Sequence, residues 1–139
     1  MTAEQPNEEM LAAADKLARF IETGRAALLR GLFADPDVTI IENFAPYLFE
    51  GPGAAAAWAK AMRGHTRGLT ALTHSFAPPY DFGRAGDVAY FSLPTTWRGL
   101  SHGKAFTETG GWAFVLVWRG GAWRVRAYGW AVTGFSFDD

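Results

Sequence analysis

The pair Gly120-Gly121, with an apolar run on each side, constrains the fold of this chain more than any other feature. Glycine tolerates the positive φ angles that a tight two-residue turn needs at both central positions. The sequence therefore predicts a β-hairpin over residues 110–133. Its predicted register pairs Arg119 with Ala122, Trp118 with Trp123, Leu116 with Val125, Phe114 with Ala127 and Trp112 with Gly129.

The two faces of this hairpin differ, because side chains alternate across a strand. One face is apolar and carries Trp112, Phe114, Leu116, Trp118, Trp123, Val125 and Ala127. The opposite face carries Arg124, Arg126, Tyr128 and Trp130 against Ala113, Val115 and Val117. A sheet with one dry face must be covered by other elements. We expect the N-terminal helices to cover it and any function to lie in the space that they leave open.

The N-terminal part of the chain predicts two helices. Asn7 can cap a helix over residues 8–22, in which apolar residues recur at steps of three and four. Residues 25–33 predict a second, shorter helix, which ends at the segment 34–37 because Pro36 cannot continue it.

The rest of the chain predicts one more helix and five strands. The helix covers residues 54–62, and the strands cover residues 38–42, 69–76, 87–97, 105–119 and 123–133. Between them lie a ring-rich loop, residues 43–50, and a loop over residues 99–104. Pro94 marks an edge position or a bulge, and Gly110-Gly111 is the expected bulge that bends the sheet. This order predicts an α+β fold in one domain, residues 1–139, with loose tails at 1–7 and 135–139.

The composition limits the kinds of partner that the chain can bind. With 139 residues and no cysteine, it can bury a core but cannot form disulfides or thiolate metal sites. The net charge of −1 is spread without a basic patch, so we expect no nucleic acid partner. An acidic N-terminus and the lack of a long apolar run predict a cytoplasmic protein without a membrane partner. Aromatic residues reach 15%, so some rings should line a pocket for a small apolar or aromatic molecule.

The order of elements resembles that of the nuclear transport factor 2-like superfamily, which includes SnoaL-like polyketide cyclases and ketosteroid isomerases. The local phrases that carry this resemblance are Gly86-Asp87-Val88-Ala89-Tyr90 and Gly121-Ala122-Trp123-Arg124-Val125. The resemblance implies a cystatin-like cone, with the N-terminal helices packed in the concave face of a strongly curved, mainly antiparallel sheet around a pocket. It also implies a homodimer through the outer sheet face, where Tyr128 and Trp130 would supply an apolar patch.

The same resemblance disfavours ketosteroid isomerase chemistry. In those isomerases the general base is an Asp just after the first strand, in a context like Thr39–Asn43 of this chain. Asn43 holds that position, and its amide cannot accept a proton at neutral pH. The Tyr and the protonated Asp that donate hydrogen bonds in such isomerases have no counterpart in this sequence either. The catalytic Asp and His pair of some dehydratase relatives also finds no match in this sequence.

Two residues are candidates for acid–base chemistry. His74 lies in the middle of a strand between Leu72 and Phe76. It is either a general base that points into the pocket or a hydrogen-bonded, semi-buried histidine. Glu108 shares a face with Trp112 unless a bulge intervenes. On the dry face its pKa would be raised, which suits a general acid, and on the other face it would be a solvated strand residue.

Six residues are candidates for ligand binding. Asn43, Phe44 and Tyr47 lie where the pockets of the family open, and Tyr47 is either a hydroxyl donor or part of an apolar plug. Tyr90, Trp97 and Trp112 either form ring walls of a cavity or belong to the core. We expect His65 and His102 to be solvated. The three histidines do not have the spacing of metal ligands, and no serine lies in a recognisable nucleophile turn. The sequence therefore predicts no metal, no cofactor and no Ser-His-Asp hydrolase.

Three functions remain open. The first is small-molecule binding in an aromatic-lined apolar pocket. The second is a SnoaL-like enzyme, namely an isomerase, cyclase or dehydratase that transfers protons on a hydrophobic cyclic substrate, with His74 or Glu108 as acid–base and Tyr47 as donor. The third is a structural dimerisation module with a filled core. A cavity of a few hundred Å³, with at least two polar groups, would favour the first two.

Overall fold

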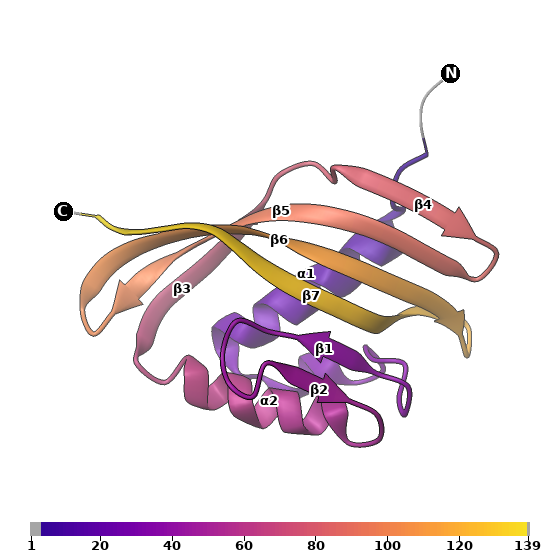
Figure 1. Cartoon of the computed structure of the whole chain (residues 1–139), viewed down its shortest axis with the longest axis horizontal. Helices are drawn as coiled ribbons and strands as arrows, with labels where there is room; N and C mark the ends of the chain where they lie inside the picture. Colours follow the sequence, from indigo (N-terminus) through magenta and orange to yellow (C-terminus); the bar gives the residue numbers. More distant parts are fainter. Residues whose placement is uncertain (1–3, 139) are drawn as a thin grey trace.

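The computed structural model describes residues 4–138 of the chain (Figure 1). Its elements are α1 (Glu8–Thr23), the 3-10 helix η1 (Ala26–Leu29), β1 (Thr39–Ile41), β2 (Leu48–Glu50), α2 (Ala54–His65), β3 (Leu69–Phe76), β4 (Asp81–Ala85), β5 (Val88–Ser101), β6 (Lys104–Arg119) and β7 (Ala122–Phe137). None of the helices within residues 4–138 is long and apolar enough to cross a membrane.

The strands form one curved sheet in the order β2-β1-β7-β6-β5-β3, and β4 pairs with the first part of β5. All pairs are antiparallel except β1 with β7. The long strands β5, β6 and β7 arch over α1, and α2 lies near β1 and β2 (Figure 1). The predicted α+β class, with helices against a curved and mainly antiparallel sheet, is confirmed.

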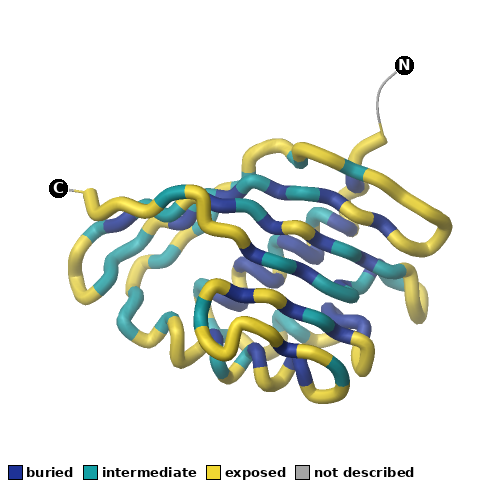
Figure 2. The backbone as a smooth tube through the Cα atoms, in the orientation of Figure 1, coloured by how far each residue is buried: buried dark blue, intermediate teal, exposed yellow. Residues whose placement is uncertain are grey.

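The core lies between α1 and the concave face of the sheet. Asn7 caps α1 as predicted, since its side chain accepts a hydrogen bond from the Met10 N–H at 2.9 Å. Along β5 and β6, buried residues alternate with exposed or half-buried ones, as Figure 2 shows. Phe91, Phe114 and Leu116 are fully buried because they lie on the concave face, in one core cluster with the buried residues of α1. The sheet therefore has the one dry face that the sequence predicted.

The predicted hairpin is correct near its turn and wrong beyond it. Gly120 and Gly121 have φ angles of 64° and 80°, and the pairs Arg119–Ala122, Trp118–Trp123 and Leu116–Val125 are confirmed. The next predicted pairs are wrong: Phe114 faces Tyr128 instead of Ala127, and Trp112 faces Trp130 instead of Gly129. The cause is a bulge in β7, because Arg126 is an extra residue between the pairs Leu116–Val125 and Val115–Ala127.

This bulge moves two rings to the other side of the sheet. Tyr128 and Trp130 are only 2% and 8% exposed, so the predicted outer patch made of these two side chains is wrong. One extra residue reverses the face of every residue after it. The hairpin tip is also asymmetric, since Trp123 is buried while Trp118 is 42% exposed.

A second register shift lies near Gly110, where a bulge was expected. The extra residue is Thr133 on β7, since Thr109 pairs with Gly134 and Gly110 with Val132. The register between β5 and β6 is continuous, and Pro94 pairs with Gly111 without a bulge. Glu108 therefore stays on the same face as Trp112, the concave one.

Other predicted boundaries shift. Residues 25–33 form only the single turn η1, the segments 43–50 and 81–85 contain β2 and β4, and β5 and β6 continue through the predicted loop 99–104 to a turn at His102 and Gly103. β7 extends to Phe137, so the prediction of a loose tail from residue 135 is wrong up to that point. Residues 1–3 and 139 lie outside the described part of the chain.

Candidate functional site

A cavity of about 60 Å³ lies on the concave side of the sheet, between the ends of α1 and α2 and the strands β3, β5, β6 and β7. Its walls are mainly apolar and aromatic, and several polar groups interrupt them. The lining residues are Ile21, Glu42, Asn43, Phe44, Met62, His65, Thr66, Leu69, Leu72, Trp97, Phe106, Glu108, Trp112 and Trp130. The cavity is smaller than the few hundred Å³ set as the sequence criterion, but it meets the criterion of two polar groups.

Glu42 is the most deeply buried carboxylate at this cavity. It follows β1 directly and is 5% exposed. Its Oε2 atom accepts hydrogen bonds from Trp58 Nε1, at 2.9 Å, and from the Tyr128 hydroxyl. Burial raises the pKa of Glu42, and the hydrogen bonds from Tyr128 and Trp58 oppose that rise. Burial and the negative charge of Glu42 together raise the pKa of Tyr128 well above its usual value.

Three elements bring this cluster together. The parallel pairing of β1 with β7 places Ile40, two residues before Glu42, opposite Tyr128. The bulge at Arg126 turns the Tyr128 side chain to the concave face, and α2 supplies Trp58, which is fully buried. The ring centroids of Trp58 and Tyr128 lie 6.0 Å apart in an edge-on arrangement. The position of Glu42 therefore depends on contacts far apart in the sequence.

Glu108 is the second carboxylate at the cavity. It lies on β6, pairs with Trp97 of β5, and is half-buried. Burial raises the pKa of Glu108, and a hydrogen bond from the Trp130 side chain opposes this rise. The negative charge of Glu108 adds to the rise in the pKa of Glu42, so the two carboxylates interact.

His65 completes the titratable groups that line the cavity. It lies at the end of α2 and stacks on Phe44, with ring centroids 4.1 Å apart and an interplanar angle of 12°. Burial lowers the pKa of His65, which favours the neutral imidazole. His65 is an exposed residue, as the sequence predicted, although the stacking on Phe44 shields one face of its ring.

Trp112 has an unusual polar group. The residue is 2% exposed, and its indole N–H has no hydrogen-bond partner. Among the described residues, it is the one buried side-chain nitrogen or oxygen without a partner. Leaving a buried donor unpaired costs about 1–3 kcal/mol, so such a group calls for an explanation. A cavity-lining residue with a free donor fits a site that receives a hydrogen-bond acceptor from a bound molecule.

The structure brings together five of the predicted site residues. Asn43, Phe44, Trp97, Glu108 and Trp112 all line the cavity. Of the two predicted placements of Glu108, the one on the dry face is the one that the structure shows.

Two other predicted residues lie elsewhere. Tyr47 is 59% exposed in the turn between β1 and β2, where its backbone has a φ of 72°. Tyr90 is 39% exposed, because β5 directs it to the outer face opposite Val115. Neither residue lines the cavity, so the predictions of Tyr47 as a donor or plug at its mouth and of Tyr90 as a ring wall are corrected.

Sequence reasoning missed Glu42, His65, Phe106 and Trp130 as cavity residues. Glu42 had one signal, since it is a carboxylate directly before Asn43, the position at which the resemblance places a general base. Trp130 had none, because the bulge that turns it inward has no sequence signature.

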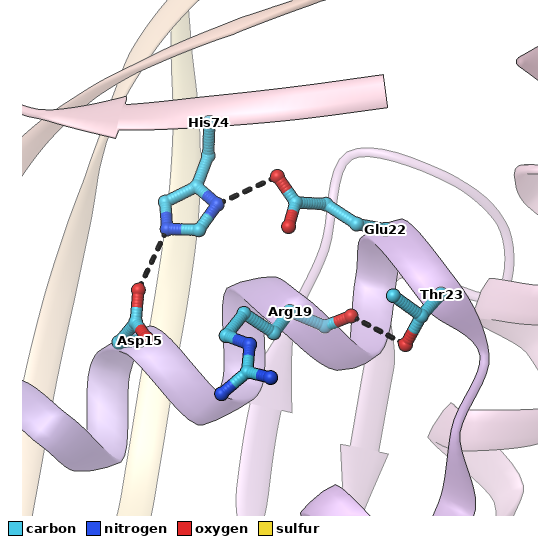
Figure 3. Close-up of polar contacts among 5 residues, drawn as sticks. All are labelled: Asp15, Arg19, Glu22, Thr23 and His74. Atoms are coloured by element: carbon cyan, nitrogen blue, oxygen red, sulfur yellow. Dashed lines mark hydrogen bonds and ion pairs between the residues drawn. The ribbon is translucent and has the colours of Figure 1, made fainter. Parts of the chain in front are cut away.

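His74 lies near the cavity but does not line it. It extends from β3 toward α1 and lies between two carboxylates of that helix (Figure 3). Its Nδ1 is 2.7 Å from Glu22 Oε2, and its Nε2 is 2.9 Å from Asp15 Oδ1. The side chain is 11% exposed, and its ring lies 5.6 Å from that of Trp97. This placement agrees with the hydrogen-bonded, semi-buried alternative for His74.

The two contacts of His74 join α1 to the edge strand β3, because each ring nitrogen faces a carboxylate oxygen of the helix. No group of three or more potential metal ligands occurs among residues 4–138.

Comparison with known proteins identifies the fold. No protein-family model matches the sequence, and no curated protein matches it closely. Solved structures do match. They include a hexachlorocyclohexane dehydrochlorinase, LinA-type3, from Novosphingobium barchaimii LL02, with 9% identity, a TM-score of 0.77, and coverage of 94% of this chain and 88% of that one.

Two further structures support the same conclusion. A nuclear transport factor 2-like superfamily protein from Salmonella enterica serovar Typhimurium has 17% identity and a TM-score of 0.68. The match covers 88% of this chain and 89% of that one. A scytalone dehydratase-like protein from Novosphingobium aromaticivorans DSM 12444 has 15% identity and a TM-score of 0.71. The match covers 94% of this chain and 88% of that one. The chain has the nuclear transport factor 2-like cone fold that the order of its elements predicted.

The cross-link of His74 predicts a measurable coupling. In a double-mutant cycle of His74→Gln and Glu22→Gln, urea unfolding should give a coupling energy of about 1 kcal/mol or more, because the pair is largely shielded from water. The exposed pair Arg119–Asp37, at 3.5 Å, is the control and should couple by only a few tenths of a kcal/mol. Equal coupling in the two cycles would contradict the structural role of the contact between His74 and Glu22.

The burial of Glu42 predicts a pH dependence of stability. Because the folded-state pKa is raised, the folded protein favours the protonated carboxyl, and stability falls as the pH rises from the unfolded value of about 4.5 through the folded one. Glu42→Gln removes this loss and keeps a carbonyl oxygen as acceptor. Its free energy of unfolding should therefore increase relative to wild type as the pH rises above 4.5 in urea titrations. Glu50→Gln is the exposed control. If the free energy of unfolding of Glu42→Gln instead falls relative to that of wild type as the pH rises, the prediction is refuted.

Proposed function

We propose that this protein binds a small molecule in the aromatic cavity of the concave face. The observation that carries the proposal is the free indole N–H of Trp112 at a cavity whose other polar groups include Glu42, Glu108 and Asn43. Binding sites typically combine apolar and aromatic walls with a few convergent polar groups. A structural module with a filled core gives no reason for two desolvated carboxylates and an unpaired donor in one place.

The size of the cavity limits the ligand. Pockets for drug-sized ligands commonly measure roughly 300–1,000 Å³, and this one holds about 60 Å³. We therefore assign it a compact chemical group, with any larger part of the molecule outside the mouth. The exposed outer face of the sheet, which includes Ile41, Val88 and Tyr90, supports the homodimer that the family resemblance implies.

The dimer can be tested independently of the ligand. Sedimentation velocity should give the mass of two chains, and Tyr90→Glu should shift the protein toward the monomer, because a charge would be buried in the interface. Lys60→Glu, on an exposed position of α2 and not on the sheet, is the control. A monomer at high micromolar concentration would refute the dimer without affecting the cavity.

Ligand binding can be followed at the indole N–H groups. We expect small apolar probes with one oxygen, such as phenol, to shift the indole NMR signals of Trp97, Trp112 and Trp130, which line the cavity. Trp118 and Trp123 at the hairpin tip are internal controls and should not shift. If the probe series shifts no indole signal, or shifts the tip signals equally, the cavity is not the binding site.

Acid–base catalysis is the second candidate function. The observation that favours it is the raised pKa of both Glu42 and Glu108, since a carboxyl that titrates nearer neutral pH can both accept and give a proton. Proteins of similar fold include a dehydrochlorinase and a scytalone dehydratase-like protein, whose names denote eliminations. Glu108 is the better candidate base, because both hydrogen bonds from Trp58 and Tyr128 already occupy one oxygen of Glu42.

Proton transfer can be tested without knowledge of the substrate. In D2O, the protein should exchange the α-hydrogens of a small ketone such as cyclopentanone faster than buffer does, as NMR can measure. Glu108→Gln should reduce this exchange about 100-fold, in line with general base catalysis, and Glu50→Gln should leave it unchanged. If exchange in wild type equals that in buffer for a series of small carbonyl compounds, the cavity binds without this chemistry.

A further inference from the structure

We propose that the cavity recognises an organic ammonium group, so that its ligand is a small alkylated amine or a molecule with such a head group. This inference rests on the proposed function, because it names the class of molecule that the cavity binds. It combines three features of the cavity, namely its charge, its rings and its size.

The cavity contains two acidic side chains and no counterion from the protein. Glu42 and Glu108 line it, and no lysine or arginine is among its lining residues. Neither carboxylate forms an ion pair with any residue in the described range 4–138. A buried carboxylate without a partner is costly, and proteins usually pair it with a cation. A ligand cation would supply the missing charge.

The remaining charged groups near the cavity do not supply it. Arg63, on α2, donates to the Gly24 carbonyl at 2.7 Å, at the end of α1 and outside the lining. His74 is held by Asp15 and Glu22 on the α1 side of β3. His65 is the one basic side chain in the lining, and its burial favours the neutral ring. No positive charge of the lining would repel a bound ammonium group.

Hydrogen bonds keep Glu42 suited to this role. Trp58 and Tyr128 both donate to the Oε2 atom, and donors stabilise the ionised form of a carboxylate. The same contacts fix the carboxylate at the cavity wall, because all three residues are buried. Binding a cation would favour the ionised form of both carboxylates further.

The aromatic lining supplies the second half of the recognition. Five rings surround the cavity: Phe44, Trp97, Phe106, Trp112 and Trp130. The face of an aromatic ring attracts a cation, most strongly for tryptophan, and alkylated ammonium ions are commonly bound by cages of such rings. A neutral apolar ligand would pack against the rings but would leave both carboxylates without a counterion. The combination therefore favours a cation with an apolar surface.

Size decides the part of the ligand that enters. A volume of about 60 Å³ accepts a compact methylated ammonium head but no fused ring system. A hydroxyl or carbonyl oxygen a few atoms from the nitrogen could accept the hydrogen bond that the Trp112 indole leaves unused. Choline has both groups, and 3,3-dimethylbutan-1-ol is its neutral analogue of the same shape.

These two compounds isolate the effect of charge. In calorimetric or NMR titrations at pH 8, we expect choline to bind at least ten times more tightly than 3,3-dimethylbutan-1-ol. Glu108→Gln should lower the affinity for choline about ten-fold and change the affinity for the alcohol by less than two-fold. The exposed control Glu50→Gln should change neither affinity. Lowering the pH from 8 to 4.5 should weaken the binding of choline alone, because carboxyls with a pKa raised above 4.5 are mostly protonated there and lose their charge. Thermal unfolding of each variant verifies that it is folded.

Each other outcome has a definite meaning. If the alcohol binds as tightly as choline, the ammonium inference is overturned and small-molecule binding stands. If choline binds equally well to wild type, Glu108→Gln and Glu42→Gln, the carboxylates do not recognise it, which also overturns the inference. If neither compound binds and phenol shifts no indole signal of Trp97, Trp112 or Trp130, the proposed function fails together with it.

Discussion

The structure around the site depends on one interaction, the pair of hydrogen bonds that the buried Glu42 carboxylate accepts from Trp58 and Tyr128. It joins the end of β1, the middle of α2 and β7, three segments that do not adjoin in the sequence. A buried carboxylate is tolerated only where hydrogen bonds compensate for lost water. This requirement fixes the orientation of both donors, and with it the wall of the cavity. The aromatic residues that line the cavity then pack around a polar group instead of filling the space completely.

The local patterns of the sequence were sufficient for most of the fold. The glycine turn at Gly120, the alternation along β5 and β6, and the cap at Asn7 all depend on near neighbours, so the sequence predicts them correctly. The bulge at Arg126 does not depend on near neighbours. It allows Tyr128 and Trp130 to enter the core, and the gain comes from packing against α1, α2 and β1, which no local pattern encodes.

The candidate site shows the same division. Glu108 and Trp112 were placed by strand parity, and Asn43 and Phe44 by family resemblance, and all four line the cavity. Tyr90 was misplaced because alternation alone does not show which face of a strand meets the helices. His74 was correctly singled out as a polar residue on an inward strand position, but α1 brings Asp15 and Glu22 to it, and only the packed structure shows that. Its contacts stabilise the cone beside the cavity.

The central claim is that two interacting carboxylates are desolvated at one aromatic cavity. Carbon-13 NMR titration of the glutamate side-chain carboxyl groups tests it most directly, with the exposed Glu50 measured in the same experiment. The account predicts that Glu42 and Glu108 both titrate above the ordinary glutamate pKa of about 4.5 and that each responds to the ionisation of the other. Titration of both groups at or below the ordinary value, each independent of the other, would contradict it.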